Sequence, residues 1–220
     1  MLVVVLALAA DPRPPPDVAT VVKAVVAAAG GEQAWRAAPC RVERGKVSTP
    51  KNVGTLYRAV AWPARLHLEV TYATNPTERR VLNGGLAWID GQPVQGAQLA
   101  ALTLQAARAG LPLILLDRKD ELVDRGLTSR AGLTLRRLEL PLGQDLWLEV
   151  EIDTTTHRVL TSTGHVGRLV MGVSYDDWRP VGALTLPFKE ETFTNRAPTG
   201  VVTLDSVELS ASLPTELFRN

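Results

Sequence analysis

Residues 146–153 read LWLEVEID, and they belong to a run of similar segments that decides the fold. One face of an extended chain would carry four aliphatic side chains, Leu146, Leu148, Val150 and Ile152. The opposite face would carry the acidic residues, which is the alternation of a half-buried strand. Comparable segments with turn signals between them occur at residues 133–140, 157–163, 168–175, 183–194 and 201–209. Regular short strands of this kind predict an antiparallel sheet that curls or closes on itself.

The first half of the chain contains a second series of predicted strands. In the third of them, Leu66, Leu68 and Val70 alternate with polar residues. Pro, Asn or Gly bounds each strand of the series, which covers residues 41–48, 53–62, 65–72, 78–82 and 86–90. Together the two series predict a single curved sheet of roughly ten or more strands, given the usual strand length.

Helices are expected to cover the concave side of this sheet. Asp17 is a suitable N-cap for an amphipathic helix at residues 18–29, which Gly30 and Gly31 would end. Shorter helices are predicted at residues 32–37, 98–109 and 111–117. The last two interrupt the strands near the middle of the chain. The sequence therefore predicts a mainly β fold with helices packed on a curved antiparallel sheet.

The composition is that of an ordinary globular protein. Hydrophobic residues make up 45% and charged residues 21% of the 220 residues, so a core can be buried. The length suits one domain, which we place at residues 17–220. The formal net charge is +1 and Lys and Arg are dispersed, which argues against nucleic acid as a partner. Cys40 is the single cysteine, so no disulfide can form within the chain.

The first residues are typical of an export signal. Residues 1–10 are apolar and end in small residues, and a proline-rich segment follows at residues 11–16. Because a charged leading region is missing, we interpret residues 1–10 as the remnant of a signal peptide, cleaved near Ala10 or Asp11. The run is shorter than the about 20 residues that span a bilayer, and no cysteine follows it to carry a lipid anchor. If residues 1–10 are a signal remnant, the protein is expected in the periplasm. The alternative interpretation of residues 1–10 is an apolar first strand.

Two stretches, GGEQAW at residues 30–35 and YDDWRPVGALTLP at residues 175–187, carry a resemblance to a known family. With the signal-like run, the helical insertion and the two series of strands, they resemble the LolA/LolB-like superfamily of periplasmic lipoprotein carriers and outer-membrane lipoprotein-sorting proteins. The resemblance implies an incomplete, strongly curved antiparallel β-barrel with an apolar concave face and helices that serve as a lid. It also implies an acyl chain bound in that cavity, with membrane-associated donor and acceptor proteins as partners.

No motif predicts a catalytic residue, a metal ligand set or a cofactor. The three histidines, His67, His157 and His165, lack metal-binding spacing and are expected at the surface or near turns. The serine of GVSYD at residues 172–176 lacks the final glycine of a nucleophile elbow and lies in a predicted strand. Cys40 has no patterned histidine partner, so a cysteine nucleophile is not predicted either.

Two pairs of adjacent acidic residues are also unsuited to catalysis. Neighbouring residues of a strand point to opposite faces, so Glu190 and Glu191 do not converge on one substrate atom. The pair Asp176 and Asp177 is expected to organise a turn before Pro180. The sequence therefore favours a protein that binds a ligand over one that transforms it.

We predict an exported, non-enzymatic and monomeric carrier that shields the acyl chain of a lipid or lipoprotein. Acyl chains leave a bilayer only for a comparably apolar pocket, because each buried methylene is worth about 0.8 kcal/mol. The alternative is a structural or accessory module of an envelope enzyme or transporter, with a filled core and no ligand. Both a cavity and a filled core fit the sequence. The residues predicted to line the cavity and its lid are Leu66, Leu68, Val70, Trp88, Leu99, Leu102, Leu113, Ile114 and Leu116.

Overall fold

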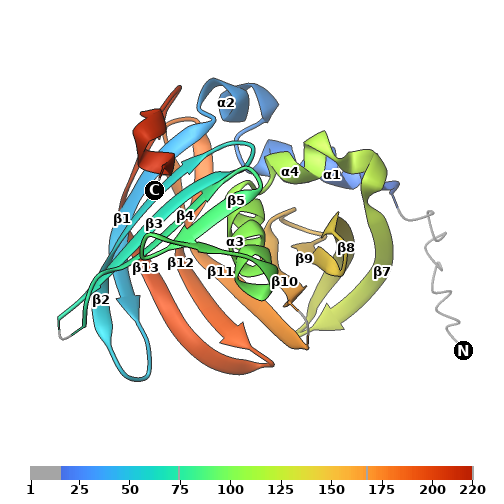
Figure 1. The fold of residues 1–220 in the computed structure, drawn as a ribbon. Helices are drawn as coiled ribbons and strands as arrows, with labels where there is room; N and C mark the ends of the chain where they lie inside the picture. The colour runs from blue at the N-terminus through green and yellow to red at the C-terminus, as the bar shows by residue number, and fades with distance from the viewer. Residues whose placement is uncertain (1–15, 74, 167, 220) are drawn as a thin grey trace, which may run out of the picture.

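The structure is a computed structural model that describes residues 16–73, 75–166 and 168–219. The predicted signal remnant at residues 1–10 lies outside the described residues, as do residues 11–15 of the proline-rich segment. Within the described ranges, no helix has both the length and the apolar character needed to cross a membrane. The described chain forms a strongly curled sheet with helices on its concave side (Figure 1).

Thirteen antiparallel strands form one sheet in the described part of the chain, in the order β6-β5-β4-β3-β2-β1-β13-β12-β11-β10-β9-β8-β7. Neighbours in the sheet are consecutive in sequence, apart from β1 and β13, which join the two series of strands. The end strands β6 and β7 do not pair with each other, so the predicted incomplete barrel is confirmed (Figure 1). The strands are β1 Cys40–Ser48, β2 Val53–Ala61, β3 Arg65–Tyr72, β4 Glu78–Asn83, β5 Leu86–Ile89, β6 Gln92–Val94, β7 Val123–Arg130, β8 Leu133–Gly143, β9 Leu146–Asp153, β10 Val159–Val166, β11 Leu169–Val181, β12 Leu184–Thr194 and β13 Ala197–Ser210.

The two edge strands were not predicted, because neither has an alternating apolar face. Strand β6 has three residues, one of them a proline, and β7 is exposed along most of its length. The turn predicted at Asp176 and Asp177 is wrong, since β11 continues through both residues to Val181. Asp177, with φ of 53°, lies between the paired residues Asp176 and Trp178, and the register of β11 with β12 is the same on both sides of it. The strand therefore continues past Asp177, and the chain reverses only after Val181.

The helices lie close to where the sequence places them. Helix α1 spans Val18–Ala28, and the Asp17 Oδ1 atom accepts a hydrogen bond of 2.7 Å from the Thr20 backbone N–H. That bond satisfies one of the N–H groups left free at a helix N-terminus, as predicted for an Asp N-cap. The remaining helices are α2 Glu32–Ala37, α3 Gly96–Ala109 and α4 Leu113–Asp117, with short 3₁₀ helices η1 Lys119–Glu121 and η2 Thr215–Phe218.

The largest hydrophobic cluster joins helices α1 and α4 to the later strands. Four buried valines of α1 face this cluster, where Ile114 and Leu115 of α4 meet the leucines of β8 and β9. The four are Val21, Val22, Val25 and Val26. Burial of an aliphatic side chain of this size is worth about 1.5–3 kcal/mol, so the amphipathic stripe holds α1 against the sheet. Packing of α1 on the concave side is therefore as predicted.

Helix α3 lies inside the curl of the sheet and contacts both of its halves (Figure 1). Leu104 is fully buried against the later strands, in contact range of Gly164 on β10. Leu102, on another side of the helix, packs with Leu66 of β3 and Leu82 of β4. The insertion thus supplies core packing between the two series of strands in addition to covering the sheet.

The convex face of β1 to β4 is covered by the C-terminal segment. Phe218 of η2 is fully buried against Val42 and Ala59. The surface position predicted for His67 is wrong, because its Nδ1 lies 2.5 Å from the carbonyl oxygen of Leu217 and only 4% of the residue is exposed. The sequence pattern of β3 places His67 opposite the Leu66 face but cannot show that a segment from residue 217 covers it.

Gly30 fixes the junction between α1 and α2 against β12. Its φ is 114°, and a Cβ atom there would collide with the carbonyl oxygen of Ala183. The Thr185 N–H donates a hydrogen bond of 3.1 Å to the Ala29 carbonyl, so the junction lies directly against β12.

We expect Gly30→Ala to lower the free energy of unfolding by roughly 2–4 kcal/mol in urea titrations. Gly31→Ala is the matched control, because Gly31 also has a positive φ but no atom lies within 4 Å of its Cβ position; equal losses would contradict the steric account.

Candidate functional site

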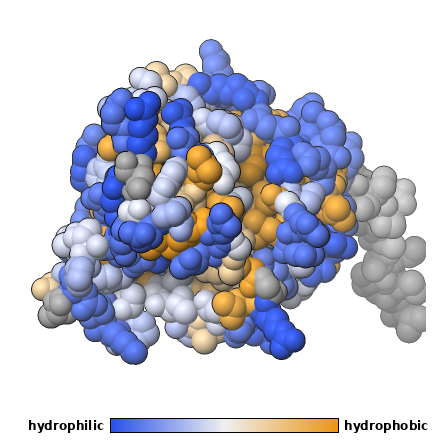
Figure 2. Space-filling model, viewed as in Figure 1, coloured by the Kyte–Doolittle hydropathy of each residue, from blue (hydrophilic) through white to orange (hydrophobic). Residues whose placement is uncertain are grey.

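A cavity of about 350 Å³ lies between the concave face of the sheet and helices α1 to α3. It extends from the helices toward the hairpin ends of β1–β2 and β12–β13, where Thr49 and the exposed Thr199 border it. On the face shown in Figure 2, apolar surface gathers near the centre, around α3. Apolar side chains from the helices and from both series of strands line the walls, including Val25, Leu56, Leu66, Leu68, Val70, Leu111, Val173 and Leu186. The volume falls within the roughly 300–1,000 Å³ of small-molecule pockets.

The structure brings three of the predicted ligand-binding residues together at this cavity. Leu66, Leu68 and Val70 point from β3 into it, because alternate residues of a strand share a face. Leu66 and Val70 are buried, whereas Leu68 is half-buried. The part of the insertion that lines the cavity runs from Gln105 to Pro112. Sequence reasoning placed the lining on other residues of the insertion.

The other six predicted residues do not line the cavity. Leu99 and Leu102 pack in the cluster of β3 to β5, Leu113 packs with Trp35, and Ile114 and Leu116 pack in the cluster around α1. Trp88 lies on β5 opposite Val81. Its neighbour Ala87 joins the α3 cluster, so alternation places Trp88 on the opposite face. Helical spacing identified the apolar side chains of the insertion but could not show that they are used for packing.

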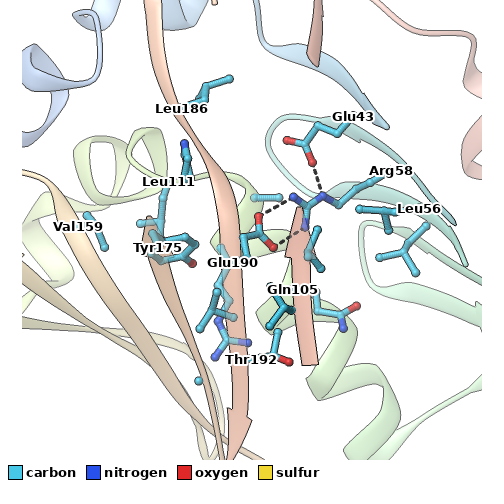
Figure 3. Close-up of a pocket in the computed structure, with 18 of the residues that line it drawn as sticks. Glu43, Leu56, Arg58, Gln105, Leu111, Val159, Tyr175, Leu186, Glu190 and Thr192 are labelled. Atoms are coloured by element: carbon cyan, nitrogen blue, oxygen red, sulfur yellow. Dashed lines mark hydrogen bonds and ion pairs between the residues drawn. The ribbon is translucent and has the colours of Figure 1, made fainter. Parts of the chain in front are cut away.

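One wall of the cavity carries a chain of four charged residues. Glu43 of β1 accepts hydrogen bonds from Arg41, at 2.5 Å, and from Arg58 of β2. Arg58 also binds Glu190 of β12 through two parallel contacts, at 3.0 and 2.6 Å (Figure 3). The four side chains are only 4–13% exposed. Charge-assisted and bidentate contacts of this kind tie β1, β2 and β12 together across the curl.

Glu43 and Arg58 keep their charges at neutral pH. Burial alone would raise the pKa of Glu43, but the guanidinium groups of Arg58 and Arg41 outweigh it and lower that pKa to about 2. Burial acts against the charged form of Arg58, whereas Glu190 and Glu43 together raise its pKa above the ordinary value. Two carboxylates and two guanidinium groups therefore compensate one another inside the protein.

A second polar group surrounds Arg108, near the C-terminus of α3. Its Nε donates to the Ser162 hydroxyl at 3.0 Å, and its Nη2 donates to the Met171 carbonyl at 2.5 Å. The Ser162 hydroxyl in turn lies 2.8 Å from the hydroxyl of Tyr175. Burial raises the pKa of Tyr175 to about 12, so its hydroxyl stays protonated. Gln105, one turn earlier on α3, points into the same cavity (Figure 3).

Sequence reasoning missed every charged residue of the cavity. Arg41 and Glu43 alternate with apolar Val42, and that pattern is typical of a solvent-facing side of a strand. In the structure Val42 instead packs against the C-terminal segment, and the charged face turns inward. The prediction that Glu190 and Glu191 point to opposite faces is confirmed, since their side chains are 12% and 54% exposed. Among the described residues, no group of three or more His, Cys, Asp or Glu side chains is placed to hold a metal ion.

Known proteins resemble this chain in structure. No protein-family model matches the sequence, and no curated protein matches it. A LolA superfamily protein from Nitrosomonas europaea superposes with a TM-score of 0.61 at 11% identity, over 92% of this chain and 97% of that one. An outer membrane lipoprotein-sorting protein domain from Vibrio parahaemolyticus gives 0.53 at 8% identity, over 91% and 95%. A DUF1329 family protein from Desulfovibrio piger gives 0.51 at 12% identity, over 92% and 97%.

These superpositions cover 91–92% of this chain and 95–97% of each similar protein. At identities of 8–12%, the superpositions show a similar fold and do not identify a ligand. The ligand has to be inferred from the cavity. What the superpositions show as shared is the overall fold. The chain therefore has the fold of the LolA superfamily, as the resemblance of its sequence predicts.

Proposed function

We propose that this protein is an exported carrier that shields the acyl chain of a lipid or lipoprotein in its cavity. The observation that carries the proposal is the cavity of about 350 Å³ on the concave side of the sheet. An ordinary filled core would leave no such space, because protein interiors are packed as densely as organic crystals. A carrier needs this space together with walls that an apolar chain prefers to water.

The walls suit an acyl chain on energetic grounds. Leu56, Leu66, Leu68 and Val70 form a continuous apolar strip on β2 and β3, and Leu186 lies on β12 across the curl. Transfer of each methylene from water to such a surface is favourable by about 0.8 kcal/mol. A chain of a dozen methylenes would then gain about 10 kcal/mol, before the cost of immobilising it.

The fold supports the same assignment. One protein of this fold is described as an outer membrane lipoprotein-sorting protein, and another as a LolA superfamily protein. By analogy we place this protein in the periplasm, where it would take an acyl chain from one membrane-associated partner and deliver it to another. We propose that it does so as a monomer, since one chain encloses the cavity.

The alternative function is a structural or accessory module that binds no lipid. Both functions would use the same fold, so they differ in what occupies the cavity. Native mass spectrometry of the purified protein, before and after lipid extraction, separates them. We expect the untreated protein to carry a mass consistent with a bound acyl lipid, and the extracted protein to regain it on incubation with lipid. A protein that never carries a lipid mass would contradict the carrier and leave the accessory module.

A further inference from the structure

The charges that face the cavity do not cancel. Five arginines and three glutamates line it: Arg41, Arg58, Arg80, Arg108, Arg158, Glu43, Glu78 and Glu190. Arg80 pairs with Glu78, and the Arg158 guanidinium lies over the ring of Trp178. Glu43 binds Arg41 and Arg58, and Glu190 binds Arg58. Neither of these two carboxylates forms an ion pair with Arg108. Arg108 has no ion pair with any residue that the structure describes. One positive charge is left without a carboxylate partner on the wall formed by α3.

Arg108 is largely closed to water, and Glu190 acts on it only at longer range, without an ion pair. Its two hydrogen-bond acceptors are a hydroxyl, of Ser162, and a carbonyl, of Met171. Burial lowers the pKa of Arg108, which is the sign of a charge removed from water without full compensation. A guanidinium group does not lose its proton in a protein, so an anion close by is the remaining way to compensate it.

The geometry leaves donors for such an anion. Within the described ranges the Nη1 of Arg108 donates no hydrogen bond, while Nε and Nη2 hold the group in place. Fixed in this way, the guanidinium group is preorganised to bind a carboxylate oxygen. The wall that carries it also carries the Tyr175 hydroxyl, which Ser162 orients at 2.8 Å.

Gln105 adds a second observation. It precedes Arg108 by three residues on α3, so the two side chains are neighbours on one helix face. Its Oε1 is buried and makes no hydrogen bond to any described residue. A buried acceptor without a partner costs about 1–3 kcal/mol, and a carboxylate cannot satisfy it because it has no proton to donate. A half-turn of the amide exchanges its oxygen and nitrogen, and the N–H donors can then point to a carboxylate. Arg108, Gln105 and Tyr175 thus form a polar patch in the same cavity as the apolar strip of β2 and β3.

We propose that the cavity selects amphiphiles with a carboxylate at the end of an alkyl chain, and that Arg108, assisted by Gln105 and Tyr175, binds that carboxylate inside the protein. The alkyl chain lies along Leu66, Leu68 and Val70. This inference rests on the proposed carrier function and narrows its ligand from acyl chains in general to free fatty acids. A chain with a neutral end would leave Arg108 uncompensated, so it binds more weakly.

Binding of palmitate and of hexadecanol to the delipidated full-length protein tests the proposal, because the two ligands differ in their end group. We expect the wild type to bind palmitate at least about tenfold more tightly than hexadecanol, since hydrogen bonds to charged groups exceed those to neutral ones. Equal affinities, or a preference for hexadecanol, would overturn the carboxylate site and leave the carrier intact. Binding of neither ligand would overturn the carrier function itself.

Two variants assign the preference to Arg108. Arg108→Gln is expected to lose the tenfold preference for palmitate while keeping its affinity for hexadecanol, and Arg108→Lys is expected to keep part of it. The control is Arg125→Gln, since Arg125 is exposed, pairs with Glu139 and lies outside the cavity. An unchanged preference in Arg108→Gln would show that Arg108 only anchors α3. If Arg108→Gln fails to fold, the preference for palmitate over hexadecanol in the wild type and in Arg108→Lys still tests the proposal.

Discussion

Replacing Arg58 with methionine is expected to destabilise the protein by about 3–5 kcal/mol. Arg58 is the central member of the buried chain of charges and gives Glu190 its only ion pair among the described residues. Without Arg58, the Glu190 side chain, which is only 12% exposed, has no ion-pair partner, whereas Glu43 still pairs with Arg41. A buried carboxylate without a partner is much costlier than the net value of the pair that held it. Urea unfolding at neutral pH measures the loss.

Two further variants test the cause of this loss. Arg44→Met on the same β1–β2 hairpin removes an arginine whose pair with Glu208 is exposed, so we expect a change below about 1 kcal/mol. Adding Glu190→Gln to Arg58→Met removes the orphaned charge and should restore part of the stability. A double variant no more stable than Arg58→Met would contradict the account, because the loss would then come from packing alone.

Replacing Leu68 with glutamate is expected to weaken binding of a fluorescent fatty-acid probe at least about 100-fold. Leu68 lies in the middle of the apolar strip and is half-buried, so the new carboxylate faces the cavity without entering the packed core. A bound alkyl chain would remove that carboxylate from water, and the carboxylate would also repel an anionic end group. Equilibrium titration with the probe measures the effect, and thermal unfolding checks that the fold is kept.

Thr55→Glu is the matched control for Leu68→Glu. Thr55 is exposed on the neighbouring strand β2, and its neighbour Leu56 is the residue that lines the cavity. The control adds the same charge to the same part of the sheet but on its other face. Equal weakening by both variants would show that the net charge of the protein, and not the cavity, controls binding.

The strands could be predicted from the sequence wherever one face was buried. Leu146, Leu148, Val150 and Ile152 are all at most 7% exposed, as their alternation predicts. Strand β7 could not be predicted, because an edge strand with exposed side chains has no such alternation. The continuation of β11 through Asp177 also escaped prediction, since two adjacent Asp residues shortly before a proline are typical of a turn.

The candidate site was predictable only in its apolar part. Leu66, Leu68 and Val70 follow from the period of one strand, which is local information. The chain Arg41–Glu43–Arg58–Glu190 depends on the pairing of β1 with β13 and of β13 with β12, which brings residue 190 near residue 58. Contacts over 132 positions of sequence leave no local pattern. The inward orientation of Arg41 and Glu43 likewise depends on Phe218 covering the other face.

Titration of the delipidated wild-type protein with a fluorescent fatty-acid probe tests the carrier function most directly. The account predicts saturable binding of one probe per chain, with release of the probe when unlabelled palmitate is added. One site is expected because the account places the ligand in one cavity, of about 350 Å³, on the concave side of the sheet. A protein that is folded by circular dichroism and takes up no probe would contradict the carrier function.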